Sequence, residues 1–275
     1  MSKLALGTVQ FGCQYGINSA GRPDNNMVRQ ILEEACNHGI KILDTSAAYG
    51  NSEEVLGSTG IADRFKIVSK YPKCEKTVKE TLDASLKNLG CNRLYGYLLH
   101  HFSVYTENKA IWNDFIQLKK EGLVEKIGFS LYEPSELDII LADNIPFDII
   151  QIPYNVFDRQ FEPYFQRLKE KGVEIHVRST FLQGLFFMDR ESLPEKLLPL
   201  KYSLLELDRH AGNYGISVGD LALNYNIHNK YIDGVLIGVD NKEQLLKNIE
   251  SVSDTAFDIN IKIDNQELLK PVNWN

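Results

Sequence analysis

Residues 65–100 read FKIVSKYPKCEKTVKETLDASLKNLGCNRLYGYLLH, and they hold a strand, a helix and a second strand in that order. The apolar runs at 65–70 and 94–100 have the length and composition of buried strands, whereas the stretch 77–90 has apolar residues at helical spacing. Two strands joined through a helix form a parallel β-α-β unit. This stretch therefore predicts a parallel sheet with crossover helices.

The helix of this unit carries its own start and stop signals. Thr77 and Glu80 have the spacing of a capping box, and Gly90 follows the last apolar residue, where a glycine commonly ends a helix. Between these signals, Leu82 and Leu86 lie one helical turn apart on one face. We expect this helix to span the whole of the stretch.

The same alternation extends in both directions along the chain. No linker, low-complexity segment or change of composition divides it, so we expect one domain over residues 1–275. Eight β-α units close most naturally as a (β/α)8 TIM barrel, an α/β fold with its active site at the C-terminal face of the strands. The expected strands cover 4–11, 40–46, 65–70, 94–100, 126–130, 149–155, 174–180 and 234–239. The expected helices cover 25–39, 77–90, 107–122, 133–143, 159–172 and 241–250, with two more within 196–228.

A doubly wound sheet is the competing arrangement of alternating strands and helices. Such folds usually carry G-x-G-x-x-G after their first strand to hold a dinucleotide. Here the first strand runs into GTVQFG (7–12), which lacks that spacing and has no Gly-Lys-Ser/Thr after it. The sequence therefore favours the barrel.

The composition excludes several classes of function. With 43% apolar and 24% charged residues the chain can bury a core, and its net charge of −7 argues against a nucleic-acid or anionic-membrane partner. No basic segment followed by an apolar one opens the chain, and we expect a cytoplasmic protein. Four cysteines occur singly and are expected to be reduced thiols: Cys13, Cys36, Cys74 and Cys91.

Four polar residues follow three successive expected strands. Asp44 lies near the C-terminal end of the second strand, Tyr49 lies in the loop after it, Lys70 ends the third strand and His100 ends the fourth. Alone, each has an ordinary explanation: a helix cap, a surface ring, a solvated ammonium, a packed core imidazole. Because parallel strands of a barrel end at one face, we expect the four side chains to gather there.

The chemistry of this group suits proton transfer to an oxygen. A tyrosine with a pKa of about 10 is a poor acid at neutral pH, and a nearby Lys70 ammonium would lower that pKa. Asp44 would hold the lysine, and His100 would orient a carbonyl oxygen. These residues supply no hydride, so a redox cofactor is needed.

The chain resembles the aldo-keto reductases, a family of NAD(P)H-dependent barrel oxidoreductases, over its whole length. DTSAAYGNSEEVLG (44–57) is similar to the family motif D-T-x-x-x-Y-G-x-S-E. Weaker motifs follow in family order: VSK (68–70), YLLH (97–100), KIGFS (126–130), IIQIPYN (149–155) and VLIGVDNKEQLLKN (235–248). The resemblance implies an NAD(P)-dependent oxidoreductase that reduces an aldehyde or ketone.

By the same resemblance, Asp44, Tyr49, Lys70 and His100 form a catalytic tetrad. Hydride would pass from nicotinamide C4 to the carbonyl carbon, and Tyr49 would protonate the oxygen. Ser130 and Gln151 match positions that bind the nicotinamide carboxamide. Residues matched to the rest of the cofactor are Arg178, in place of a stacking aromatic ring, Ser179, Phe181 and Gly184 at the pyrophosphate, and Gly238, Asp240, Lys242, Gln244 and Asn248 at the adenosine half.

NADP(H) is the cofactor that the family implies, with NAD(H) as an open alternative. Gly238 and Gln244 stand where the family frequently has Lys and Arg for the 2′-phosphate, and Asp240 is unfavourable for a phosphate. Lys242 can compensate. The resemblance does not predict the oligomeric state.

Two other functions compete with a reductase. One is a cofactor-binding regulatory or sensor subunit of the same fold with little turnover, which the complete tetrad disfavours. The other is a metal-dependent barrel lyase, disfavoured because only His100 and His176 lie on strands; we predict no metal. The partner is then a small-molecule carbonyl compound, and the GTVQFG opening resembles bacterial members linked to surface sugars. Trp112 and Trp274 are candidates for its pocket.

Overall fold

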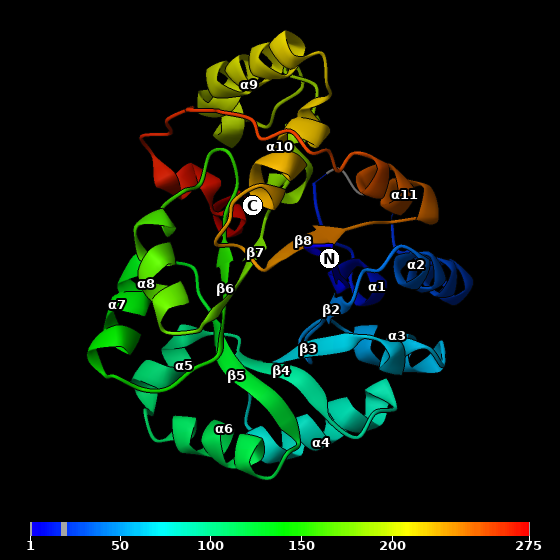
Figure 1. Ribbon diagram of the computed structural model, residues 1–275, viewed down its shortest axis with the longest axis vertical. Helices are drawn as coiled ribbons and strands as arrows, with labels where there is room; N and C mark the ends of the chain where they lie inside the picture. Colours follow the sequence, from blue (N-terminus) through cyan, green and yellow to red (C-terminus); the bar gives the residue numbers. More distant parts are fainter. Residues whose placement is uncertain (1, 18–20, 275) are drawn as a thin grey trace.

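The computed structural model describes residues 2–17 and 21–274, and its centre is a closed parallel barrel of eight strands in sequence order. Figure 1 shows the barrel with helices around it. Closure comes from pairing of the first strand with the eighth, for example Ala5 with Leu236. The predicted TIM barrel is confirmed. The strands are β1 Leu4–Gly7, β2 Ile42–Asp44, β3 Lys66–Tyr71, β4 Leu94–Leu99, β5 Val124–Ser130, β6 Ile149–Pro153, β7 Glu174–Arg178 and β8 Gly234–Gly238.

Helices separate the strands along the chain. Short 3₁₀ segments cover Ala62–Arg64, Glu162–Tyr164, Leu182–Phe187, Glu195–Leu200, Gln266–Leu269 and Pro271–Asn273. The α-helices are α1 Val9–Gly12, α2 Asn25–Asn37, α3 Ser52–Ser58, α4 Val78–Leu89, α5 Phe102–Glu107, α6 Ile111–Lys120, α7 Pro134–Ala142, α8 Phe165–Glu170, α9 Lys201–Tyr214, α10 Val218–Ile227 and α11 Lys242–Glu250. Among the described residues, none of these helices is long and apolar enough to cross a membrane.

The signals that bound α4 work as predicted. The Thr77 side chain accepts a hydrogen bond from the Glu80 backbone N–H, and the Glu80 carboxylate accepts one from the Thr77 backbone. Gly90 ends the helix with φ +67°, a left-handed conformation that glycine adopts without a Cβ clash. The local sequence therefore determines both ends of this helix.

Several expected elements differ in extent from the observed ones, and two of them show the local cause. The strand predicted over 4–11 stops at Gly7, and the helical turn α1 follows at Val9. The Thr8 backbone N–H donates to the carbonyl oxygen of Asp44, which is the last residue of β2. The chain therefore leaves the sheet directly after this hydrogen bond. The helix predicted over 107–122 begins only at Ile111, because Asn108 is extended and its side chain accepts a hydrogen bond from Ala110 N; the preceding helix α5 ends at Glu107.

The inner and outer faces of the sheet have separate apolar clusters. The large one lies between sheet and helices, while Val68, Tyr95, Leu98 and Ile149 form a small cluster of their own. A Cβ on Gly96 would lie 2.9 Å from Ile149 Cδ1, so a side chain here would crowd this small cluster. Alternate residues of a strand share a side. Lys70 thus lies on the same side of β3 as Val68, one pleat nearer the C-terminal face.

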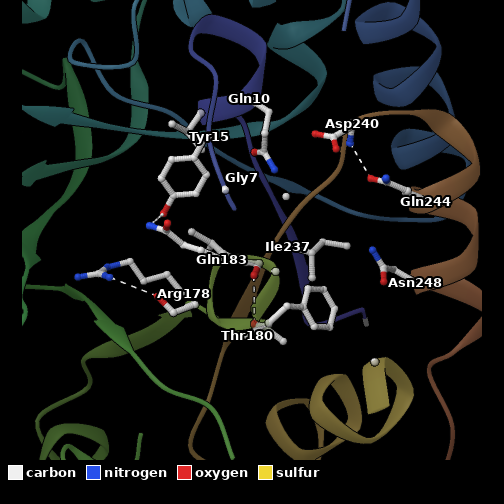
Figure 2. A pocket seen from close by; sticks show the side chains of 18 of the residues that line it. Gly7, Gln10, Tyr15, Arg178, Thr180, Gln183, Ile237, Asp240, Gln244 and Asn248 are labelled. Carbon is white, nitrogen blue, oxygen red and sulfur yellow. Dashed lines mark hydrogen bonds between the residues drawn. The ribbon is translucent and has the colours of Figure 1, made fainter. Parts of the chain in front are cut away.

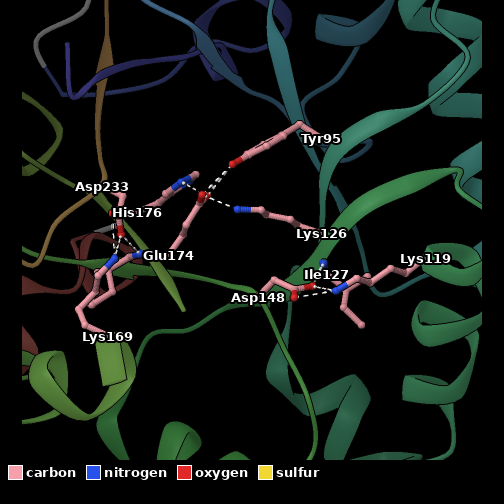
Figure 3. Close-up of polar contacts among 10 residues, drawn as sticks. Tyr95, Lys119, Lys126, Ile127, Asp148, Lys169, Glu174, His176 and Asp233 are labelled. Atoms are coloured by element: carbon pink, nitrogen blue, oxygen red, sulfur yellow. Dashed lines mark hydrogen bonds and ion pairs between the residues drawn. The ribbon is translucent and has the colours of Figure 1, made fainter. Parts of the chain in front are cut away.

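The opposite end of the barrel holds a polar network near the strand starts (Figure 3). Tyr95 of β4 donates to Glu174 Oε1 of β7 at 2.7 Å, and Lys126 of β5 forms an ion pair with the same carboxylate. His176 Nε2 lies 3.5 Å from Glu174 Oε2. Burial by itself would raise the pKa of Glu174, but its hydrogen bonds with His176, Lys126 and Tyr95 lower that pKa to about 2. This network joins three strands and is far from the C-terminal face.

An extra helical layer follows β7. The chain forms α9 and α10 before returning to β8, and Figure 1 shows α9 outside the ring of helices. A second apolar cluster packs these helices against the C-terminal tail.

Trp274 packs against this cluster, and its indole donates to Leu268 O at 2.9 Å. Trp112 is buried and stacks on Phe129 with 4.1 Å between ring centroids. Both tryptophans are structural, and neither lines the pocket described below.

Candidate active site

The C-terminal ends of β2 and β3 bring an acid and a base together. Lys70 Nζ lies 2.6 Å from Asp44 Oδ1, and both side chains are buried. The same ammonium donates to Thr45 O at 2.9 Å. The other Asp44 oxygen accepts a hydrogen bond from Gln151 Nε2 of β6, also at 2.6 Å. Residues from opposite sides of the barrel thus hold this carboxylate in place.

The loop after β2 brings Tyr49 over this pair. Lys70 Nζ lies 3.5 Å from the Tyr49 hydroxyl oxygen and 5.0 Å from the centre of its ring. The ring packs edge-on against His100, with 5.7 Å between centroids. Asp44, Tyr49, Lys70 and His100 therefore form one contiguous group, although 56 positions separate Asp44 from His100 in the sequence.

Close backbone packing fixes the position of this loop. A Cβ on Gly12 would lie 1.8 Å from Tyr49 O and 2.5 Å from Ser52 N, so only glycine fits there. Gly50 has φ +56° and faces Gly12 O. The Ser52 hydroxyl donates to Thr8 O at 2.8 Å, which ties the start of α3 to β1. Helix α3 begins at Ser52 with Asn51 in the N-cap position, but neither side chain makes a capping hydrogen bond, and Ser52 is turned toward Thr8.

The acidity of Tyr49 differs from the expectation. Burial raises its pKa well above the usual value, and the charge of Asp44 raises it further. Arg178 opposes this change but does not reverse it. The prediction of a lowered pKa is wrong here because the Lys70 ammonium is compensated by Asp44 at 2.6 Å, and burial dominates. Tyr49 therefore remains protonated at neutral pH and is available as an acid.

His100 is neutral. Burial, assisted by the charges of Lys70, His101 and Arg178, lowers its pKa to about 2. Its Nδ1 lies 3.0 Å from Ser46 Oγ, which itself accepts a hydrogen bond from Ala48 N. If Ser46 donates its proton to Nδ1, the proton of the imidazole must lie on Nε2. That arrangement makes Nε2–H the donor of the ring, although His100 is not among the residues that line the cavity described below.

His101, the neighbour of His100 in the sequence, lies beyond the end of β4. It precedes α5 as the N-cap residue, is exposed, and stacks its ring on His100 at 4.8 Å. The strand pleat ends at Leu99, so the alternation that would have turned His101 away from His100 no longer applies. Its ring covers one face of the His100 imidazole.

A cavity of about 380 Å³ extends from this group toward α11 (Figure 2). Tyr15, Arg178 and Gln183 lie at one end of the view, and Asp240, Gln244 and Asn248 lie at the other. The predicted site residues that line the cavity are Asp44, Tyr49, Gln151, Arg178, Ser179, Phe181, Gly184, Gly238, Asp240, Gln244 and Asn248.

Two predicted cofactor residues lie outside this wall. Ser130 is buried beside Gln151 in the sheet, and Lys242 begins α11 without reaching the cavity. Lys247, five residues farther along α11, lines the cavity instead. Helical periodicity offered a signal for Lys247, because it lies three residues after Gln244 on α11 and so on the same face, but the motif itself pointed to neither Lys247 nor Ser46.

The wall has features that suit a bound dinucleotide. Gln10 Oε1 is a buried acceptor without a hydrogen-bond partner, and the Gln10 side chain lies against Gly238 where a Cβ would clash. Ser179, Leu182 and Gln183 have positive φ angles between 46° and 64°, a conformation that costs about 1–3 kcal/mol per residue and is often found at ligand clamps. Gln183 Nε2 donates to the Tyr15 hydroxyl at 2.8 Å, which links the loops after β7 and β1. Among the residues that the structure describes, no three His, Cys, Asp or Glu are grouped so as to hold a metal ion.

Comparison with known proteins agrees with the resemblance in sequence. A model of the Aldo/keto reductase family matches residues 3–261. The chain belongs to this family. It is therefore an NAD(P)-dependent oxidoreductase that acts on carbonyl groups, and the resemblance inferred from DTSAAYGNSEEVLG is confirmed.

Individual relatives are distant. The chain is 26% identical to the uncharacterized oxidoreductase YqkF of Bacillus subtilis, over 92% of this chain and 89% of that protein. It is 27% identical to L-galactose dehydrogenase of Arabidopsis thaliana, over 81% and 77%. Among solved structures, the holo form of aldo-keto reductase AKR11C1 from Bacillus halodurans has a TM-score of 0.76 at 23% identity, covering 94% of this chain and 88% of that one. An aldo-keto reductase from Klebsiella pneumoniae in complex with NADPH has a TM-score of 0.70 at 19% identity, covering 93% and 87%. At these identities the structures bear on the fold alone.

Proposed function

We propose that this reductase converts an aldehyde or ketone to an alcohol, with Tyr49 as the proton donor. The observation that carries the proposal is the Tyr49 hydroxyl at the cavity wall, 3.5 Å from a Lys70 ammonium that is itself paired with buried Asp44. A protonated phenol beside a fixed positive charge is suited to protonate an oxygen on which negative charge develops.

Each residue of the group has a distinct role in this proposal. Bound NAD(P)H supplies the hydride that the protein lacks. Tyr49 donates its proton to the carbonyl oxygen as the carbon is reduced, and the Lys70 charge stabilises the phenolate that remains. His100, neutral and oriented by Ser46, donates from Nε2 to the same oxygen. Asp44 and Gln151 keep Lys70 in position.

NADP(H) is the proposed cofactor, with NAD(H) as the alternative. A Klebsiella pneumoniae relative was solved with NADPH, and Lys247 places one ammonium at the adenosine end of the cavity. The carboxylate of Asp240 at the same end favours a ribose hydroxyl over a phosphate. Titration of protein fluorescence with NADPH and NADH distinguishes the two, and Lys247→Gln should weaken only NADPH if Lys247 binds the 2′-phosphate.

A sugar aldehyde or keto-sugar is a candidate substrate. One relative is named L-galactose dehydrogenase, and the polar residues of the cavity wall match a hydroxylated ligand. A panel of aldoses and small aldehydes, assayed by NADPH oxidation, tests this class. The cytoplasmic location and the single domain over 1–275 remain predictions.

The decisive variant is Tyr49→Phe, which removes only the hydroxyl oxygen. We expect turnover to fall by about 100- to 10,000-fold, while NADPH still binds with its wild-type affinity. Wild-type turnover in this variant would remove Tyr49 from the mechanism. The regulatory-subunit alternative predicts the opposite pattern for the wild type: tight NADPH binding with negligible reduction of any aldehyde in the panel.

A further inference from the structure

Arg178, the last residue of β7, carries a fixed positive charge into the cavity. Its Nη2 donates to Leu131 O at 3.1 Å, and its Nη1 donates to Ser179 Oγ at 3.4 Å. The guanidinium lies over the Tyr132 ring, with 4.1 Å between Cζ and the ring centre. Contacts with two neighbouring loops thus hold the group in one orientation, which reduces the entropy lost when it binds a ligand.

Among the described residues, this charge has no counter-ion. Within residues 2–17 and 21–274, no carboxylate oxygen lies within 4.0 Å of the Arg178 guanidinium, whereas Lys70 pairs with Asp44 and Arg190 pairs with Asp208. A guanidinium has five N–H groups, and two of those in Arg178 have partners among the described residues. The remaining N–H groups of this half-buried cation are therefore available to an anionic ligand.

The position of Arg178 connects it with the reacting group rather than with the adenosine end. Its charge acts on the ionisation of both Tyr49 and His100, the two side chains proposed to contact the carbonyl oxygen. Figure 2 shows Arg178 near Tyr15 and Gln183, away from Asp240 and Asn248 at the other end of the cavity. A ligand that contacts Tyr49 therefore lies within the field of this cation.

We propose that Arg178 binds an anionic group of the carbonyl substrate, so that the enzyme prefers acidic aldehydes or ketones to neutral ones. Carboxylate and phosphate both match the paired N–H groups of a guanidinium. The inference rests on the proposed reductase function and adds the charge of the substrate to it. The proposed anion binds at the N–H edge of the Arg178 guanidinium. The guanidinium face opposite Tyr132 therefore stays available for stacking on a cofactor ring.

Matched substrate pairs test the preference. The first set compares 2-, 3- and 4-carboxybenzaldehyde with their methyl esters, which keep the reacting carbonyl and remove the charge. The second compares glyceraldehyde 3-phosphate with glyceraldehyde, so that the two sets distinguish a carboxylate from a phosphate. We expect kcat/KM to be about 10- to 100-fold higher for at least one acid than for its neutral partner, mainly through KM.

Two variants assign the preference to Arg178. Arg178→Gln should reduce each acid and its neutral partner with the same kcat/KM, because the preference for the acid is lost while the neutral compounds are still reduced. Lys247→Gln removes the same charge from the adenosine end of the same cavity and should leave that ratio unchanged. The affinity of each variant for NADPH, measured by fluorescence, is the second readout.

The outcomes separate this inference from the function on which it rests. Reduction of the neutral compounds without preference in any pair would overturn the inference and leave the reductase intact. A loss of NADPH affinity in Arg178→Gln, with both members of each pair slowed equally, would overturn it in favour of a cofactor-binding arginine. If the wild type reduces no compound of either kind, the proposed function fails and the inference fails with it.

Discussion

The Lys70 ammonium lies 2.6 Å from the Asp44 carboxylate, and both side chains are almost fully buried below the Tyr49 hydroxyl. Burial lowers the pKa of Lys70, and the adjacent Asp44 charge opposes that effect. The pair is thus held by mutual compensation in a region of low dielectric, where either charge alone would be unfavourable. Stability and catalysis depend on the same contact.

Breaking this ion pair should lower both stability and turnover, and a single and a double variant separate the two effects. Lys70→Met leaves the Asp44 carboxylate buried without its cation. We expect the free energy of unfolding to decrease by about 3–5 kcal/mol and turnover to be lost. The double variant Lys70→Met/Asp44→Asn should recover most of the stability and none of the turnover. Urea unfolding and NADPH oxidation measure the two effects. Wild-type turnover in either variant would remove Lys70 from the mechanism.

The neutral state of His100 predicts a pH dependence of stability. Its pKa is lowered from 6.5 to about 2 on folding, so between these values the unfolded chain binds a proton that the folded chain does not. The part of the free energy of unfolding that depends on this neutral imidazole is fully present above pH 6.5. It decreases by about 1.4 kcal/mol per pH unit as the pH falls below that value. From about pH 6.5 to about pH 5, wild-type stability should decrease by about 1–2 kcal/mol more than that of His100→Gln. If urea unfolding shows that both proteins lose the same free energy of unfolding over this pH range, the assignment of a neutral His100 is contradicted.

The close approach of Gly12 to Tyr49 predicts a specific loss on adding one methyl group. In Gly12→Ala the new Cβ meets Tyr49 O and Ser52 N, which must move together with the tyrosine loop. We expect lower stability and a fall in kcat of about 10-fold or more, since small displacements of catalytic groups are costly. Gly60→Ala is the control: Gly60 also has a positive φ but faces open space, so only its strain of about 1 kcal/mol should appear. Equal kcat in the two variants would show that the contact does not position Tyr49.

The network around Glu174 should contribute to stability and leave catalysis unaffected. Glu174→Gln removes the charge that Lys126 and Tyr95 share, and we expect a loss of about 1–3 kcal/mol at pH 7 with kcat unchanged. The folded pKa of Glu174 lies below its usual 4.5, so its contribution exists above that value and disappears as the pH falls toward 2. The stability difference between wild type and variant should therefore narrow across that range. A difference that stays constant across it would show that the charge of Glu174 contributes nothing.

Local patterns along the chain were sufficient to predict the architecture. Alternating apolar runs and helical faces predicted the eight-stranded barrel, and Thr77, Glu80 and Gly90 predicted both ends of α4. The strand ends at Asp44 and Lys70 could be assigned to one face because parallel strands of a barrel point the same way. The helix predicted from residue 107 begins only at Ile111, and this start was missed because it depends on the Asn108 side chain accepting a hydrogen bond from Ala110 N.

The electrostatic state of the site depended on contacts between distant parts of the chain. Asp44 receives its second hydrogen bond from Gln151, 107 positions away, and Ser46 orients His100 across 54 positions. The raised pKa of Tyr49 and the uncompensated charge of Arg178 follow from burial and from the distances between charges. Periodicity reports which face of a strand or helix is apolar, so it could predict the barrel and the convergence of the strand ends. Desolvation and Coulomb interactions depend on three-dimensional distance, so only the folded chain could assign the proton of Tyr49 and the second hydrogen-bond partner of Asp44.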